Sequence, residues 1–264
     1  MKGAPRYGVW MGRISRRKLI GGIGTGVGLL AAANLVPIAF EAAGAQQPAP
    51  AKRRQWVMVI DMRRCDGCNK CTEGCQDAHH LPKTTEWIKV HRLKNKRGQE
   101  YFMPRPCMQC ENPMCLRVCP VGATFKDAEG IVLVDQDRCI GCRMCIAACP
   151  YGARYFNEKA STYVNPFGQK PTPQYPVPQQ KGTVGKCMLC VHRTGEGKLP
   201  ACVEACEMYA LYIGDLVSDV ATNGKETVRL SKFLDDNDAF RYREELNTGP
   251  HVYYIAGHGQ DLGF

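Results

Sequence analysis

The sequence predicts an α+β protein made of small modules, with short hairpins and loop-rich connections. Three observations support this. All 16 cysteines lie between Cys65 and Cys206, in four tight groups. Short apolar runs bounded by turn residues are typical of hairpin strands rather than of long helices. Residues 164–180 contain five prolines, a composition typical of an extended loop.

The first 45 residues have the layout of a signal peptide. Arg16 and Arg17 precede an uncharged stretch that runs to Phe40, and an Ala-Gly-Ala sequence ends at Ala45. Paired arginines are typical of the twin-arginine export route, so we expect the mature chain on the periplasmic or extracytoplasmic face of the membrane. A retained anchor is the alternative, because the stretch is long enough to span a bilayer. Its five glycines and Pro37 disfavour a helix there.

Each cysteine group repeats one pattern. All four open with C-x2-C and close with C-x3-C, and only the gap between these pairs changes. In chain order the groups are Cys65, Cys68, Cys71 and Cys75; Cys107, Cys110, Cys115 and Cys119; Cys139, Cys142, Cys145 and Cys149; and Cys187, Cys190, Cys202 and Cys206. An internal repeat of this kind indicates four related sites.

The spacing is typical of iron–sulfur cluster ligands. A C-x2-C loop brings two sulfurs to one metal centre, and Gly67 and Gly141 let the backbone approach closely. The closing pair has helical i, i+4 spacing and therefore shares one helix face. In bacterial two-cluster [4Fe–4S] sequences with the run C-x2-C-x2-C-x3-C, the fourth cysteine binds the other cluster. We therefore expect Cys149 to bind a different cluster from the other three cysteines of its group.

Zinc and a disulfide framework are the alternatives to iron–sulfur clusters. A tetrahedral zinc site takes two cysteine pairs, and three cysteines within seven residues plus a fourth do not divide that way. Export by the twin-arginine route, which carries folded proteins, argues against disulfides that form outside the cell.

Cluster binding would also change the net charge of the protein. The N-terminal 45 residues carry half of the formal net charge of +10. Four cubanes with their thiolates would add roughly −8 to the rest of the chain and bring its charge to about −3. The basic residues are then expected to be counter-charges for clusters rather than a nucleic-acid surface. Of the eight that lie beside the cysteine groups, some should donate hydrogen bonds that steady the clusters' negative charge, and the others are expected to be solvated surface. The eight residues are Arg63, Arg64, Lys70, Arg105, Arg138, Arg143, Lys186 and Arg193.

Several motifs resemble one family. They are CMQCENPMCLRVCPVGATFKDAEGIVLVDQDRCIGCRMCIAACPYGARYFN at 107–157, GKCMLCVHR at 185–193, PACVEAC at 200–206, GDL at 214–216 and GPHVYY at 249–254. These motifs resemble the four-cluster iron–sulfur subunits of the dimethyl sulfoxide reductase type. Polysulfide and tetrathionate reductases have such subunits, as do formate-dependent nitrite reductases and sulfite-reduction-associated membrane complexes. The resemblance runs from about residue 55 to the C-terminus.

The resemblance implies four [4Fe–4S] clusters whose ligands are exchanged between groups. Set 1 is Cys65, Cys68, Cys71 and Cys206; set 2 is Cys187, Cys190, Cys202 and Cys75; set 3 is Cys107, Cys110, Cys115 and Cys149; set 4 is Cys139, Cys142, Cys145 and Cys119. It also implies two nested ferredoxin-like modules of the bacterial two-cluster kind. The outer module spans residues 46–106 and 180–264 with a C-terminal extension, and the inserted module spans residues 107–179 with the proline-rich loop.

The chain departs from the family pattern in its outer module. Cys206 is followed by Glu207 rather than by proline. The residues after Cys75 are Gln-Asp-Ala-His-His, ending in His79 and His80, where a pattern like Lys-Ala-Glu-Asn is expected. The two histidines could be ligands or proton-linked groups. We expect instead that they lie in a solvated loop.

The remaining elements have local signals. Residues 123–135 predict a hairpin around an Asp-Ala-Glu-Gly turn, which shields the inserted module from water. The loop at 164–180 either docks on a partner or fills space between the modules. Residues 231–246 predict a helix that begins at a capping serine. Residues 251–256 predict a terminal strand with Tyr253 and Tyr254 in the core.

No nucleophile–base pair or phosphate loop stands out, so we do not expect an enzyme active site. We expect a non-catalytic electron-transfer subunit of a respiratory oxidoreductase complex. By family analogy its partners are an NrfD-like integral membrane subunit that reacts with quinone and a catalytic subunit, often a molybdopterin enzyme. A free periplasmic ferredoxin that shuttles electrons and a zinc-stabilised interaction module are the other two hypotheses.

Overall fold

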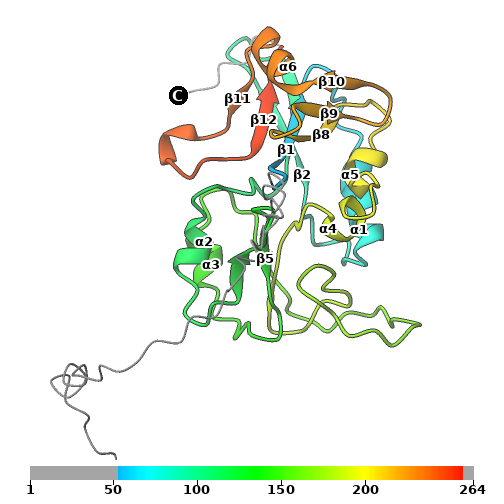
Figure 1. Ribbon diagram of the computed structural model, residues 1–264, viewed down its shortest axis with the longest axis vertical. Helices are drawn as coiled ribbons and strands as arrows, with labels where there is room; N and C mark the ends of the chain where they lie inside the picture. Colours follow the sequence, from blue (N-terminus) through cyan, green and yellow to red (C-terminus); the bar gives the residue numbers. More distant parts are fainter. Residues whose placement is uncertain (1–52, 258–264) are drawn as a thin grey trace, which may run out of the picture. The chain divides into compact units, whose positions relative to one another are not determined.

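A six-stranded mixed sheet is the largest element of the computed structural model, which describes residues 53–257 (Figure 1). Strand β1 (Trp56–Asp61) runs antiparallel to β8 (Leu211–Asp215) on one side and parallel to β12 (Val252–Ile255) on the other. The outer strands are β9 (Val220–Thr222), β10 (Thr227–Arg229) and β11 (Phe240–Arg241). The two ends of the described chain therefore meet in one sheet.

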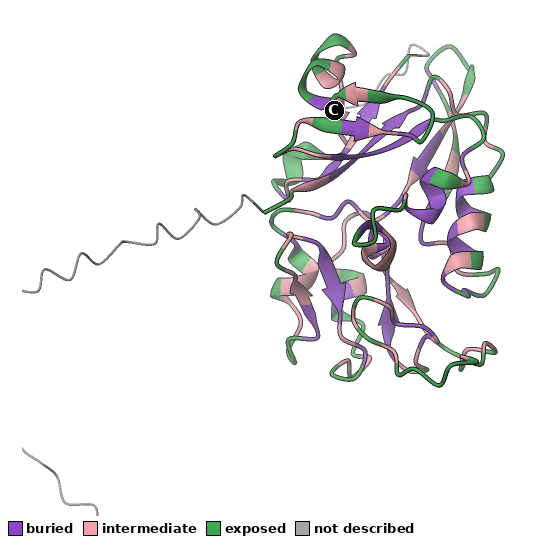
Figure 2. Cartoon of the chain, turned by 45° about the vertical axis from the view of Figure 1, so that its right-hand side comes forward, coloured by how far each residue is buried: buried purple, intermediate pink, exposed green. Residues whose placement is uncertain are grey.

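Strand β1 is buried on both faces of the sheet. Val57 and Val59 pack in one cluster with Tyr212, whereas Met58 and Ile60 belong to a second, larger cluster that contains several cysteines. Successive side chains of a strand point to opposite faces, so an uninterrupted apolar run marks a strand with both faces covered. Figure 2 shows the buried residues concentrated in these strands and on the helices beside them.

Two helices pack closely beside the sheet. Helix α1 (Lys70–Ala78) contacts α5 (Ala201–Glu204), and a Cβ atom added at Gly74 would lie 2.5 Å from the Cβ of Ala205 and 3.2 Å from the carbonyl oxygen of Ala201. Only glycine fits this close approach. Gly74 thus fixes how near the first and the fourth cysteine groups come to each other.

Short hairpins and single-turn helices make up the rest of the described chain. The hairpins are β2 (Lys89–Lys94) with β3 (Glu100–Arg105) and β4 (Thr124–Lys126) with β5 (Val132–Val134). The short strand β6 (Tyr155–Phe156) pairs antiparallel with β7 (Val184–Gly185), which follows the proline-rich loop. The helices are α2 (Met114–Arg117), α3 (Met144–Ala147), α4 (Val191–Thr194) and α6 (Leu230–Asp236), with a 3-10 turn η2 (Glu244–Leu246). Mixed small sheets and short helices agree with the predicted α+β class.

Three of the predicted local elements are confirmed. The hairpin at 123–135 is formed by β4 and β5, and the Asp127 carboxylate accepts hydrogen bonds from the amides of Glu129 and Ile131 in the turn. Residues 164–180 form turns and one isolated bridge between Thr172 and Tyr175. The terminal strand is β12, in which Tyr254 is fully buried.

The helix predicted over 231–246 is wrong in extent. Helix α6 ends at Asp236, and Asp238 then takes a positive φ of 47°, which an α-helix does not contain. Phe240 pairs with Tyr254 in the sheet instead of continuing the helix. Ser231 lies inside α6, where its hydroxyl donates to the Asp219 carboxylate, so it is not the capping residue.

The export prediction concerns the N-terminus. The signal peptide expected at residues 1–45 lies outside the described residues, and so does the alternative of a retained anchor. Among residues 53–257, no helix combines the length and the apolar character that crossing a membrane requires.

Candidate metal centres

The four C-x2-C loops share one backbone feature. The residue just before the second cysteine has a positive φ in every group: 81° at Gly67, 45° at Gln109, 70° at Gly141 and 56° at Leu189. The sequence repeat is therefore also a conformational repeat, although glycine occupies only two of the four positions. At Gly141 a Cβ atom would lie 2.2 Å from the carbonyl oxygen of Gly182, so only glycine fits at this position without a shift of the backbone.

The cysteines of set 4 surround one cavity. Cys139, Cys142, Cys145 and the distant Cys119 line an open volume of about 330 Å³. The hairpin explains how they meet: Cys119 comes five residues before β4, and Cys139 comes five residues after β5, its antiparallel partner.

The cysteines of set 3 surround a second cavity. Cys107, Cys110, Cys115 and Cys149 line an open volume of about 390 Å³, together with Tyr151 and other residues. Helices α2 and α3 contact each other, which brings Cys149 at the end of α3 towards the group that contains α2. All four of these thiols are partly exposed.

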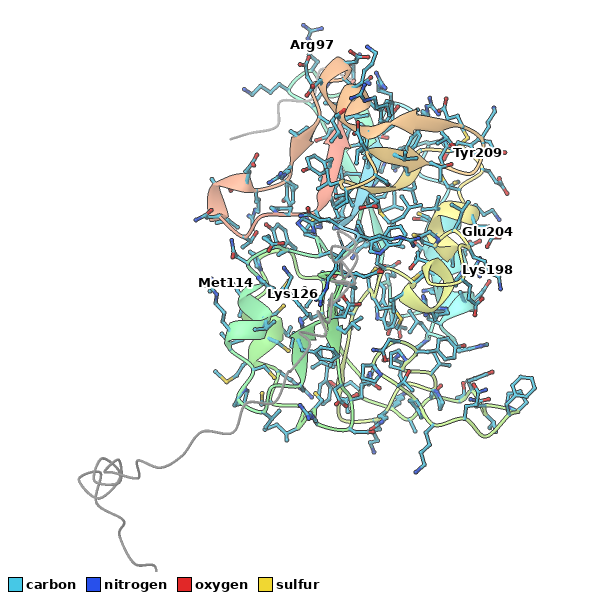
Figure 3. All side chains as sticks on the ribbon, in the orientation of Figure 1. Arg97, Met114, Lys126, Lys198, Glu204 and Tyr209 are labelled. Carbon is cyan, nitrogen blue, oxygen red and sulfur yellow. The ribbon has the colours of Figure 1, made fainter. Side chains whose placement is uncertain are left out.

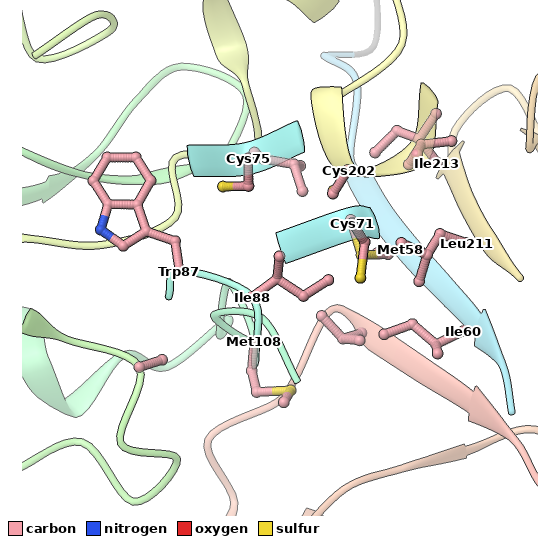
Figure 4. Packing of buried hydrophobic residues seen from close by; sticks show 14 of the residues in the cluster. Met58, Ile60, Cys71, Cys75, Trp87, Ile88, Met108, Cys202, Leu211 and Ile213 are labelled. Atoms are coloured by element: carbon pink, nitrogen blue, oxygen red, sulfur yellow. The ribbon is translucent and has the colours of Figure 1, made fainter. Parts of the chain in front are cut away.

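Sets 1 and 2 are more deeply buried. Burial raises the pKa of Cys71 to about 12, and the neighbouring Cys206 and Cys65 add to the effect. Burial likewise raises the pKa of Cys202, with further contributions from Cys190, Cys75 and Cys187 in that order. In Figure 4 the sulfurs of Cys71 and Cys75 leave α1 in different directions, towards different parts of the core.

The sheet and the helix pair bring these two sets together. Strand β1 ends four residues before Cys65, and its partner β8 begins five residues after Cys206. The α1–α5 contact at Gly74 brings Cys75 close to Cys202. The amides of Leu189 and Ala210 donate hydrogen bonds to the sulfurs of Cys187 and Cys206 at 3.4 and 3.3 Å.

The four sets follow one another in space. Burial is the main cause of the raised pKa values of Cys145 in set 4 and Cys187 in set 2. Neighbouring thiols of set 3 add to both: Cys115 at Cys145, and Cys107 at Cys187. Cys71 of set 1 likewise contributes at Cys202 of set 2. The order is therefore set 1, set 2, set 3, set 4. The exposed cysteines, Cys68 and Cys142, belong to the two end sets.

The donor chemistry fits iron–sulfur clusters. All 16 thiols are free, and four of them surround each of two cavities. Among residues 53–257 no three Cys, His, Asp or Glu side chains converge closely enough to hold one metal ion. Cysteine thiolates are the usual ligands of iron–sulfur clusters. Burial raises the pKa of Cys71, Cys110 and Cys202, so binding of a cluster by these thiols would release protons.

Most of the predicted counter-charges have carboxylate partners. The ion pairs are Arg63 with Asp61, Arg64 with Glu226, Lys70 with Glu73, Arg138 with Asp135, Arg143 with Glu158 and Arg193 with Glu204. Lys186 differs because it is 4 % exposed and its ammonium donates to the backbone carbonyls of Cys187 and Val132. Six of the eight residues thus have a carboxylate partner, and Asp61, the partner of Arg63, is fully buried.

The prediction for His79 is wrong. His79 is 1 % exposed rather than solvated, and its Nε2 lies 3.2 Å from the Cys190 sulfur of set 2. Its ring lies 5.0 Å from Trp87, and burial lowers its pKa to about 3. His80 is exposed as expected and stacks on Tyr163. The spacing of four residues between Cys75 and His79 is the signal that places both on one helix face.

Arg154 is a residue that sequence reasoning missed. It lines both the set 3 and the set 4 cavities and is 4 % exposed. It follows Cys149 by five residues in an irregular segment, where no periodicity indicates the direction of a side chain.

Comparison with known proteins gives a consistent match. Two families described as 4Fe-4S dicluster domain match the chain, one over residues 99–165 and 171–216 and the other over residues 64–123. Together these ranges contain all four cysteine groups.

Three relatives match over most of their length. A selenate reductase subunit of Mesobacillus selenatarsenatis is 38% identical over 78% of this chain and 74% of its own. A tetrathionate reductase subunit of Salmonella typhimurium is 36% identical over 92% of this chain and 88% of its own. The menaquinone reductase iron–sulfur cluster-binding subunit of Nitratidesulfovibrio vulgaris is 39% identical over 76% of this chain and 89% of its own.

Proposed function

The chain belongs to the family of 4Fe–4S dicluster subunits of respiratory reductases, and we propose that it is an electron-transfer subunit of such a complex. The observation that carries this proposal is the succession of four cysteine sets, with an exposed sulfur at each end. The succession offers electrons a path through the protein, and the proposed role of the chain is to hold that path rather than to bind a substrate.

We propose that the chain holds four [4Fe–4S] clusters on ligand sets 1 to 4. The linings of the two cavities support sets 3 and 4, and the electrostatic neighbours of Cys71 and Cys202 support sets 1 and 2. Each bound cluster would supply a one-electron acceptor and donor. The nested outer and inserted modules follow from the same ligand sets.

The protein's own contribution is to fix the sulfurs and to exclude water. The positive-φ loops hold the C-x2-C sulfurs, and backbone amides donate to sulfurs at Cys187 and Cys206. The buried hairpin strand β5, with Val132, Leu133 and Val134, lies against the cavities of sets 3 and 4. Burial and hydrogen bonds to sulfur set cluster potentials, so these features tune the path as well as hold it.

The two exposed ends are where partners would exchange electrons. Beside Cys142, the side chains of Ile140 and Met144 are 64 % and 53 % exposed, and Met114 near set 3 is 40 % exposed (Figure 3). Apolar side chains gathered on a surface support contact with another subunit. We propose an NrfD-like membrane subunit and a catalytic subunit as the two partners, on the extracytoplasmic side. The names of the relatives favour this assembly over a free shuttle.

Anaerobic purification of the full chain tests the proposal. About 16 irons with matching labile sulfide, and an electron paramagnetic resonance (EPR) signal of reduced clusters, are expected. Zinc in place of iron, or no such signal, would overturn it. The partner surface is tested by Met144→Asp, at an exposed residue outside the lining of the set 4 cavity, which should keep its iron and lose co-purification with the membrane fraction. Val164→Asp, at a residue that is 81 % exposed in the proline-rich loop, is the matched control.

A further inference from the structure

Arg154 is a buried cation whose hydrogen bonds are incomplete. Its side chain is 4 % exposed, and Nη1 donates to the Thr124 hydroxyl at 3.0 Å. Nε and Nη2 are buried and have no oxygen or nitrogen partner among the described residues, and the neighbouring acceptors are the sulfurs of Cys115 and Cys145. A guanidinium stays charged at any physiological pH, so this residue cannot avoid the cost of burial by losing its proton. Burial of this charge is unfavourable unless an anion compensates it.

The missing anion must lie in the two cavities. Arg154 lines the cavity of set 3 and also the cavity of set 4, the two volumes enclosed by cysteines. Although burial disfavours its charged form, Cys115, Cys145 and Cys107 raise the pKa of Arg154. These thiols come from both sets, so the guanidinium lies between the cysteines of the two cavities.

We propose that Arg154 is a charge-balancing residue shared by the clusters of sets 3 and 4, which donates hydrogen bonds to sulfur in both cavities and raises both reduction potentials. This inference rests on the proposed function. A fixed positive charge favours the reduced, more negative state of a cluster, and hydrogen bonds to sulfur act in the same direction. One residue would thereby keep two successive clusters at matched potentials.

Two other cations show why Arg154 is distinct. Arg143 also lines the set 4 cavity, but its side chain is 53 % exposed, is paired with Glu158 at 3.2 Å and lies over the Phe156 ring. Lys186 is as buried as Arg154, but backbone carbonyls accept its hydrogen bonds. Arg143 is therefore the matched control: the same side chain beside the same cavity, with a carboxylate partner and solvent screening.

The experiment is an EPR-monitored redox titration of the full chain and its variants. In Arg154→Met, the reduced-to-oxidised ratio of two of the four clusters at a fixed potential should fall about tenfold, equivalent to about 59 mV for one electron. Arg154→Gln should show a shift in the same direction, whereas Arg154→Lys, which keeps the charge, should stay near the wild type. Arg143→Gln should leave the set 3 cluster unchanged.

The outcomes separate the inference from its premise. A wild-type chain without iron–sulfur signals ends the proposed function and this inference together. A wild type with four clusters and variants with unshifted potentials overturns the inference alone, as does a shift confined to one cluster. A lower melting temperature with unshifted potentials means that Arg154 only supports the hairpin through Thr124.

Iron content decides the case in which the neutral variants do not assemble fully. Loss of about half the iron from the Met and Gln variants, with full iron in the Lys variant, supports the requirement for charge. Equal loss from all three variants shows that shape is required and overturns the inference.

Discussion

Removal of Cys149 tests whether a closing cysteine binds the cluster of another group. Cys149 lines the cavity of Cys107, Cys110 and Cys115, and it does not line the cavity of the other three cysteines of its own group. In Cys149→Ala we therefore expect the loss of the set 3 cluster, with sets 1, 2 and 4 intact. Iron should fall from about 16 to about 12 atoms per chain.

Paired variants identify the lost cluster without any spectral assignment. Cys107 belongs to the same set as Cys149, so Cys107→Ala combined with Cys149→Ala removes one cluster and leaves about 12 irons. Cys139 belongs to set 4, so Cys139→Ala combined with Cys149→Ala removes two clusters and leaves about 8 irons. The iron losses of the first two substitutions are non-additive, because both remove ligands of the same cluster. The iron losses of the second two add, because they affect different clusters.

Anaerobic iron and labile-sulfide analysis on purified chains gives these numbers, with circular dichroism as the check that each variant is folded. If each cysteine group held its own cluster, the two values would be exchanged: about 8 irons for the first pair and about 12 for the second. That result would refute the ligand exchange and the succession of sets built on it.

Three further perturbations give expected outcomes. Gly141→Ala places a Cβ atom 2.2 Å from a backbone oxygen at a φ of 70°, whereas Gly98→Ala, at a φ of 78°, meets no atom within 4 Å. We therefore expect Gly141→Ala to lower the free energy of unfolding by about 1–3 kcal/mol more than Gly98→Ala, which thermal unfolding measures. His79→Leu removes the imidazole nitrogen that lies 3.2 Å from the Cys190 sulfur and should shift the potential of one cluster in a redox titration, whereas His80→Leu should not. Burial lowers the pKa of His251 below its ordinary value of 6.5, so the unfolded chain binds more protons and stability is lost as the pH falls below 6.5. His251→Gln should reduce the loss of unfolding free energy between pH 7 and pH 5, measured by denaturant titration at each pH. The same loss in the variant and the wild type would contradict the argument.

The sequence predicted the elements that local signals determine. The turn of the hairpin at 123–135 is indicated by four consecutive residues, Asp-Ala-Glu-Gly, and the cysteine repeat can be read from the sequence alone. The terminal strand was equally accessible, because an aromatic and β-branched run follows a Gly-Pro stop. Each of these elements depends on neighbours within about a dozen residues.

The elements that failed depend on distant partners. Residues 231–246 have an apolar pattern typical of a helix, but Phe240 lies in β11 and pairs with Tyr254 of β12. His79 looks like a loop residue until Trp87 and Cys190, from two other segments, enclose it. The pairing of Met58 with Val252 could not be predicted either, since tertiary context overrides local propensity in strands.

Strand pairing gives a physical reason for ligands that are shared between groups. At the hairpin, Cys119 precedes β4 and Cys139 follows β5, and the antiparallel pairing of Thr124 with Val134 brings those two chain ends together. The same arrangement recurs in the large sheet, where Cys206 precedes β8 and Cys65 follows β1. In both places a closing cysteine is directed away from its own group and towards the opening cysteine of another group. For sets 1 and 4, the proposed exchange thus has a physical basis in two antiparallel strand pairs, one local and one spanning most of the described chain. Because the local pair forms without long-range loop closure, sets 3 and 4 should assemble before sets 1 and 2 during folding. Pulsed hydrogen exchange during refolding should therefore protect β4 and β5 before β1 and β8, and the opposite order would contradict this account.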